Sequence, residues 1–193
     1  MNILTIAPLN WNFIAPLGIA TLKAMDPDNI KCVNLSVKYN EPLGKIYSEK
    51  HRVLKNNVNV KNLMLSNSLC YSVRGKEMAF ADWMIIDYPM GLLNKKEDDI
   101  DIKFMNLIDD MTSELLNENP NSVGFSVFQQ NLAVSLHIAK KLHEKGIKII
   151  FGGSGVYTIY SILQKYDFID HIVVGEGENV VKDVFDGKMR EKI

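Results

Sequence analysis

The stretch "NSVGFSVFQQNLAVSLHIAKKLHEKGIKIIFGG", residues 121–153, decides the fold. It begins with an apolar, β-branched run that predicts a strand, and it ends with a second such run that stops at two glycines. Between them, apolar residues recur at helical spacing, and Gly146 stands just past the last helical turn, where glycine commonly ends a helix. Strand, helix and strand in this order predict a βαβ unit with parallel strands.

The same alternation continues on both sides of this unit. Further strands are predicted at 2–8, 30–37 and 171–175, and further helices at 16–25, 156–166 and 178–185. Five strands alternating with helices predict an α/β fold: a flavodoxin-like (Rossmann-like) five-stranded parallel sheet with helices on both faces. Ligands of such sheets bind beyond the carboxyl ends of the strands, so every loop after a strand is a candidate for the site.

Residues 41–119, between the second and third strands, are too many for one crossover helix. The amphipathic stretch 104–120 predicts the crossover helix, and the whole chain, 1–193, is predicted to be one domain with a mainly helical insertion at 41–119. Within it, 59–93 is rich in methionine and aromatic residues. We expect this part to pack on the domain; a cap over a ligand and a docking face for another protein remain open.

Composition excludes several classes of function. The net charge of −1 argues against nucleic acid or an anionic membrane as a partner. The chain shows neither a signal peptide nor an apolar run of membrane-spanning length, and it is predicted to be cytoplasmic. Cys32 and Cys70 lie far apart in sequence, which argues against a structural zinc site, an iron–sulfur cluster or a disulfide framework.

The four histidines do not cluster in sequence, and no Ser-His-Asp or Cys-His arrangement can be identified. His137 and His143 are expected to face solvent from their helix, and His171 to lie at the amino end of its strand, away from the ligand edge. No catalytic or metal-ligating residue is therefore predicted. Whether the protein is an enzyme stays open, and this chain alone is not expected to be catalytic.

Small and polar residues follow the last three strands. The stretch "FGGSG" at 151–155 offers bare backbone N–H groups to a polar ligand, or forms a tight turn that only serves packing. Ser126 stands at the end of the third strand, and "GEGE" at 175–178 follows the fifth. We interpret the two glutamates as residues stabilised by a helix dipole or as polar contacts to a ligand, rather than as an acid–base pair.

Four stretches together resemble the N-terminal cobalamin-binding domain of cobalamin-dependent radical SAM enzymes. They are "IAPLGIATLKAM", "VGFSVF", "IIFGGSGVY" and "IDHIVVGEGE". The resemblance implies a domain that binds cobalamin (vitamin B12) and so carries a metal ion within its cofactor. In such domains a Ser-x-Leu and a Gly-Gly hold the nucleotide tail of the cofactor, and Ser126-Val127-Phe128 and Gly152-Gly153 stand at the matching places here.

This chain departs from the family pattern in two ways. The loop after the first strand has no Asp-x-His-x-x-Gly, so cobalt would receive no protein histidine, and Asn10, Trp11 and Asn12 would lie nearest its lower face. The chain also lacks the Cys-x-x-x-Cys-x-x-Cys motif, so no iron–sulfur cluster is expected in it. It would be the cofactor-binding part of a radical SAM enzyme, with a radical SAM domain or other protein docking on the strand edge or on 59–93. The alternative is a degenerate relative that acts as a protein-interaction or scaffold module.

The resemblance and the loop positions together imply one set of cofactor-binding residues. They are Asn10, Trp11, Asn12, Leu17, Gly18, Ser126, Val127, Phe128, Gly152, Gly153, Ser154, Gly155, Gly175, Glu176 and Gly177.

Overall fold

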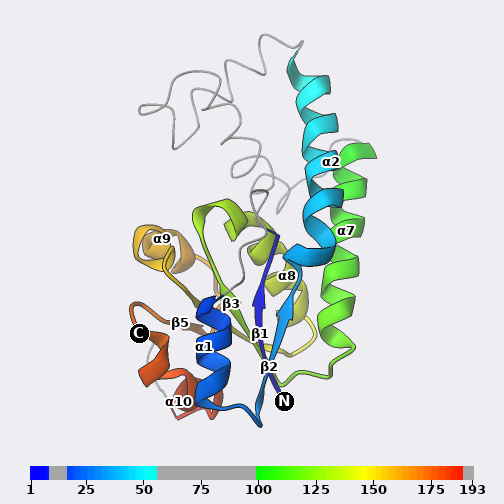
Figure 1. The fold of residues 1–193 in the computed structure, drawn as a ribbon. Coiled ribbons are helices and arrows are strands. Elements are labelled where there is room, and N and C mark those ends of the chain that lie inside the picture. Colours follow the sequence, from blue (N-terminus) through cyan, green and yellow to red (C-terminus); the bar gives the residue numbers. More distant parts are fainter. Residues whose placement is uncertain (9–16, 56–98, 189–193) are drawn as a thin grey trace.

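The computed structural model describes residues 1–8, 17–55 and 99–188, and within them five parallel strands form one sheet in the order β2-β1-β3-β4-β5 (Figure 1). The strands are β1 (Asn2–Ile6), β2 (Ile30–Asn34), β3 (Ser122–Ser126), β4 (Lys148–Gly152) and β5 (His171–Ile172). The order places β1 and β3 side by side at the point where the chain changes direction across the sheet, which is where such folds bind ligands. This topology confirms the predicted flavodoxin-like α/β fold.

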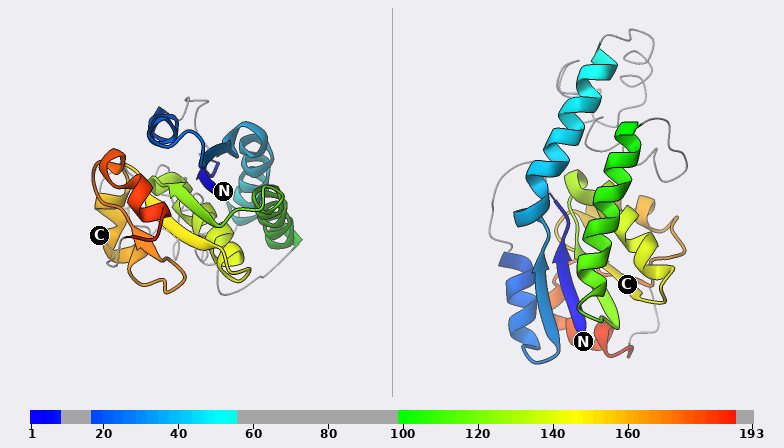
Figure 2. Two further views of the ribbon diagram at one scale, coloured as in Figure 1. Left: turned by 90° about the horizontal axis from the view of Figure 1, so that it is seen from below. Right: turned by 90° about the vertical axis from the view of Figure 1, so that its right-hand side faces the viewer.

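Helices cover both faces of the sheet (Figure 2). One face carries α1 (Leu17–Met25) and α10 (Val181–Phe185). The other carries α2 (Ser36–Lys55), α7 (Asp99–Leu116), α8 (Leu132–His143) and α9 (Val156–Leu163). Two short 3₁₀ turns, η1 (Gln129–Asn131) and η2 (Gly177–Asn179), follow β3 and β5. Among the described helices, each is too short or too polar to cross a membrane.

The hydrophobic core is much larger on the second face. It joins the strands to α2, α7, α8 and α9, with Phe125 stacked on Phe151 at 5.2 Å between ring centroids. The core under α1 and α10 is small and is built around Leu4, Ile19 and Val181. The two helices on that face therefore fill less of the space above the sheet, and the candidate site lies there.

Helices α2 and α7 pair along their length and extend past the carboxyl ends of the strands (Figures 1 and 2). Their buried residues follow helical spacing, as with Leu43 and Tyr47 on α2. Lys50 Nζ lies 2.9 Å from Asp101 Oδ1, and the two side chains are only 6% and 1% exposed. A buried pair of this kind fixes how two helices align, because either charge alone would be costly to bury.

Three predictions are wrong: they concern the ends of two strands and the environment of one histidine. The fifth strand was expected to run over 171–175, but it ends at Ile172. The second strand was expected to run over 30–37, but it ends at Asn34, whose side chain accepts a hydrogen bond from Ser36 N at 3.0 Å where α2 begins. His137 was expected to be solvated, but it is 3% exposed and meets the ring of Phe104 edge-on at 5.2 Å, because α7 packs over α8.

Other expectations agree with the structure or lie beyond what it describes. His143 is exposed as predicted, and α7 occupies the place of the predicted crossover helix. Helix α2 begins before residue 41, so the expected start of the insertion falls inside a continuous helix. The docking or capping stretch 59–93 and Cys70 lie outside the described residues.

Candidate functional site

A groove of about 410 Å³ opens on the face of the sheet that α1 and α10 cover. Its floor is formed by β1, β3 and β4, and its walls by α1 and by the segment 173–185 that contains η2 and α10. Its mouth lies at the carboxyl edge, where β3, β4 and β5 end. The groove therefore occupies the place where the topology predicts a ligand.

The floor of the groove contains small residues at neighbouring positions of β3 and β4. Between β3 and β4, Gly124 pairs with Ile150, and Ser126 pairs with Gly152 two residues further along. Each of these two pairs therefore includes at least one residue with a small side chain or none. A Cβ atom placed at Gly152 would meet only Val173, at the ordinary distance of 3.7 Å. One placed at Gly124 would lie 2.9 Å from Leu4 Cδ2. Gly152 therefore leaves open space above the floor, whereas the position above Gly124 is already filled by the side chains of Leu4 and Phe185.

The turn after β4 needs its glycines for packing. Gly153 has φ +107°, and a Cβ atom there would lie 3.0 Å from both Ser126 Oγ and Val127 N. At Gly155 a Cβ atom would lie 2.6 Å from the carbonyl oxygen of Val127. Because the turn rests on the end of β3, it fixes the position of Ser126 at the mouth of the groove. No hydrogen bond engages the Ser126 hydroxyl within the described ranges, which leaves it available to a ligand.

Asn131 joins the ends of β1 and β3. It is fully buried; its Nδ2 donates to Ser126 O at 3.1 Å and to Ala7 O at 3.4 Å, and its Oδ1 accepts from Phe128 N at 2.8 Å. These bonds satisfy backbone groups that the sheet leaves open at its edge. Asn131 does not line the groove, and it acts by holding the backbone of Ser126 in place.

The far wall is formed by the glycine and glutamate turn after β5. Gly175 adopts φ +95°, and a Cβ atom at Gly177 would lie 3.0 Å from Leu22 Cδ2 on α1. Glu176 is exposed and Glu178 is half-buried, and both line the mouth. In the part of the chain that the structure describes, no three metal-binding side chains gather, and the groove lining contains no histidine or basic side chain.

Apolar side chains also stand at the mouth. Tyr157, at the start of α9, is 82% exposed, and Val174, after β5, is 40% exposed. Leu17, at the start of α1, is 73% exposed. Large apolar groups exposed around a groove are typical of a surface that contacts a ligand or a partner.

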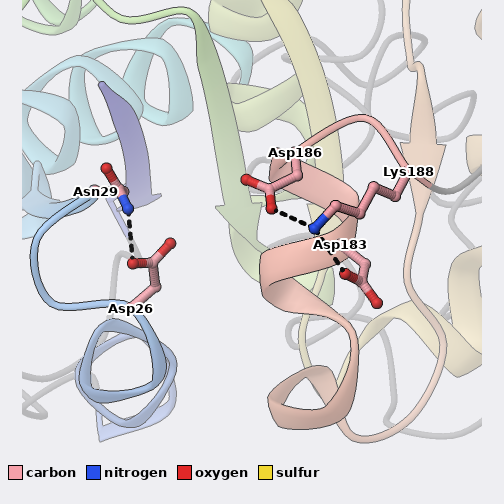
Figure 3. A network of polar contacts seen from close by, with 5 residues as sticks. All are labelled: Asp26, Asn29, Asp183, Asp186 and Lys188. Atoms are coloured by element: carbon pink, nitrogen blue, oxygen red, sulfur yellow. Dashed lines mark hydrogen bonds and ion pairs between the residues drawn. The ribbon is translucent and has the colours of Figure 1, made fainter.

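Polar contacts anchor α1 and α10 at the ends that lie away from the mouth (Figure 3). Lys188 Nζ pairs with Asp186 Oδ2 at 2.9 Å and lies 3.7 Å from Asp183 Oδ1, just after α10. In the turn after α1, Asn29 Nδ2 donates to Asp26 Oδ1 at 2.9 Å. The hydrogen bond and charge of Lys188 lower the pKa of the Asp186 carboxyl. These contacts close the two helix ends locally.

A family model described as the B12 binding domain matches residues 83–185. The chain belongs to the B12-binding domain family. The match contains β3, β4, β5 and α10, which supply most of the groove, and β1 and α1 lie outside it. No match was found among curated proteins or among solved structures.

In this B12-binding domain, most of the predicted site residues that the structure describes lie together in the groove. They are Gly18, Ser126, Gly152, Gly153, Ser154, Gly175, Glu176 and Gly177. Four others do not line it. Val127 is buried in the core of the opposite face, Phe128 packs beside the small core, Gly155 supports the end of β3, and Leu17 is exposed beside the mouth. Asn10, Trp11 and Asn12 lie outside the described residues.

Sequence reasoning missed several residues of the groove. Gly124 is one, although a glycine inside an apolar strand is itself a signal that something approaches closely. Val181, Val184 and Phe185 on α10 are others, and their helical spacing could have identified the buried side of that helix. What the sequence did not give was the strand register that turns Gly124 and Gly152 to the same face.

Proposed function

We propose that this B12-binding domain binds cobalamin, with the nucleotide tail of the cofactor in the groove and the corrin ring at its mouth. The observation that carries the proposal is the open floor at Gly152, where an added side chain would meet only Val173, in an otherwise close-packed domain. A flat aromatic base at the end of a tail needs such a slot between sheet and helices. Family membership supports the same class of ligand.

The chain's own residues would act by holding and orienting the cofactor. The free hydroxyl of Ser126 can donate or accept one hydrogen bond to the tail. Tyr157 and Val174 present apolar surface at the mouth, where the ring would rest. A bound corrinoid supplies cobalt chemistry, the transfer of a methyl group or of an electron, which protein side chains cannot provide.

We further propose that the chain is the corrinoid-binding part of a radical SAM system, and that its cobalt receives no histidine from the protein. The first part rests on the resemblance of four stretches in their order along the chain, and the second on the loop 9–16, which contains no histidine. A Cys-x-x-x-Cys-x-x-Cys motif encoded downstream or in a neighbouring gene would support the radical SAM context. Neighbouring genes without that motif would count against it.

Reconstitution tests the binding proposal directly. The protein is incubated without oxygen with hydroxocobalamin, desalted, and examined by visible absorption for retained corrinoid. We expect about one corrinoid per chain, and a spectrum in which the nucleotide base has left cobalt, since the tail would occupy the groove. A protein that elutes without corrinoid at saturating hydroxocobalamin refutes the proposal.

A further inference from the structure

The polarity of the groove changes from its mouth to its inner end. The lining side chains that can hydrogen-bond stand at or above the carboxyl edge: Ser126, Ser154, Tyr157, Glu176 and Glu178. One row further in, Leu4, Gly124 and Ile150 lie side by side across three strands. Facing this row, α10 contributes Val181, Val184 and Phe185.

The inner end therefore offers few partners to a polar ligand. Its lining side chains carry no hydrogen-bonding atom, and the backbones of β1, β3 and β4 are engaged in the sheet. The carbonyl oxygen of Val184 accepts a hydrogen bond from Lys148 Nζ at 2.8 Å. Phe185 closes the space, since its Cζ would lie 3.3 Å from a Cβ atom at Gly124.

We propose that this groove selects corrinoids by the chemistry of their lower base, and that it prefers a benzimidazole to a purine. The inference rests on the proposed function, because it requires the tail to enter the groove. Adenine carries an exocyclic amine and ring nitrogens that are hydrated in water, and at the inner end they would lose that water without gaining partners. The six-membered ring of dimethylbenzimidazole has only carbon atoms and carries two methyl groups and no amine, which matches the apolar wall of Ile150, Val184 and Phe185.

Titration with three corrinoids tests the selection. Cobalamin, adeninylcobamide and cobinamide, which has no nucleotide tail, are each titrated into the protein, and the dissociation constant is measured from visible absorption and tryptophan fluorescence. We expect adeninylcobamide to bind about ten- to a hundredfold more weakly than cobalamin, the range expected when a buried polar group is left without a partner. Equal affinities for the two would overturn the selection and leave corrinoid binding intact. Failure of all three to bind would refute the proposed function itself, and the selection with it.

A matched pair of variants locates the selection at the inner end. Ile150→Val and Ile150→Thr have the same shape and differ by one hydroxyl, placed on the inner row of the floor. We expect Ile150→Val to keep the preference for cobalamin, and Ile150→Thr to reduce it by strengthening the binding of adeninylcobamide relative to Ile150→Val. The same preference in both variants would overturn the placement of the base against Ile150. Thermal unfolding of each variant without ligand confirms that both are folded before titration.

Discussion

Replacing Gly152 with leucine should separate the groove from the fold. The position tolerates a side chain, because its φ lies outside the left-handed region and a Cβ atom would make one ordinary contact, 3.7 Å from Val173 Cβ. The rest of a leucine side chain would extend into the groove. The ligand-free protein should therefore keep its stability, or gain about 0.5–1 kcal/mol because glycine weakens a strand.

The effect on binding can be estimated from the space that the side chain takes. Overpacking a well-fitted site costs about 1–3 kcal/mol, so a cost of about 2 kcal/mol weakens cobalamin binding roughly 30-fold. At a concentration of about 100 times the wild-type Kd, cobalamin should stabilise the wild type by about 2.7 kcal/mol and the variant by about 0.9 kcal/mol. For a domain of this length these values correspond to Tm increases of about 5–11 °C and about 2–4 °C.

Thermal unfolding with and without hydroxocobalamin measures both quantities in one assay. Ser161→Leu, which adds the same side chain at an exposed position of α9 away from the groove, is the control and should behave as wild type. Refutation would be a Gly152→Leu protein that is as stable as wild type and whose Tm rises as much with cobalamin. That result would mean that the groove floor does not contact the cofactor.

Three further predictions concern stability, each measured by urea unfolding. Gly153→Ala should lower the unfolding free energy by at least about 1–2 kcal/mol, because φ is +107° there; wild-type stability would contradict the packing of this turn on β3. Lys50→Met should cost about 3–5 kcal/mol by removing the cation that pairs with the buried Asp101 carboxylate, and adding Asp101→Leu should recover most of that; no recovery would show that the ion pair itself is required. Hydrogen bonds from Lys38 and Tyr39 lower the pKa of the Glu114 carboxyl below its usual value. The ionised carboxylate therefore stabilises the fold at a pH above the usual carboxyl pKa. Wild type should therefore exceed Glu114→Gln in stability at pH 7, and lose that advantage as the pH falls through the lowered pKa; a difference that does not change between pH 7 and pH 3 would contradict this.

The regular parts of the fold were predictable because they follow local patterns. Apolar β-branched runs gave the strands, and Gly146, with φ +79°, ends the helical segment as expected. The end of β2 was not predictable in this way. The apolar pattern continues through Leu35 and Val37, but the side chain of Asn34 caps the first turn of α2 and ends the strand earlier.

Burial of single residues depended on partners that the sequence does not place. His137 lies on a helix whose residues from Leu132 to Ala139 are all buried, because α8 packs both on β4 and against α7. A periodic pattern shows one apolar side of a helix and gives no sign that a second element covers the other. The polar Asn131 was missed for a related reason. Its three partners are Ala7, just after β1, Ser126, at the end of β3, and Phe128, in the loop between β3 and η1.

The site was predicted in part because its loops carry unusual residues and its walls do not. Glycines at the ends of β4 and β5 attracted attention from sequence alone, and Gly152, Gly153, Gly175 and Gly177 all line the groove. Gly124 and the valines of α10 resemble ordinary core residues. Their part in the groove follows from the parallel register and from the packing of α10, which only the folded structure provides.

The open floor at Gly152 has a consequence for how this protein can change over generations. Most binding sites are lost when a required group disappears, but this one would be lost when a group is added. At Gly152 a single base change in the codon can introduce a side chain that the fold accepts, since the nearest contact is an ordinary one. Selection for folding alone would not remove such a change. We therefore expect Gly152 to remain a glycine only while selection for ligand binding continues.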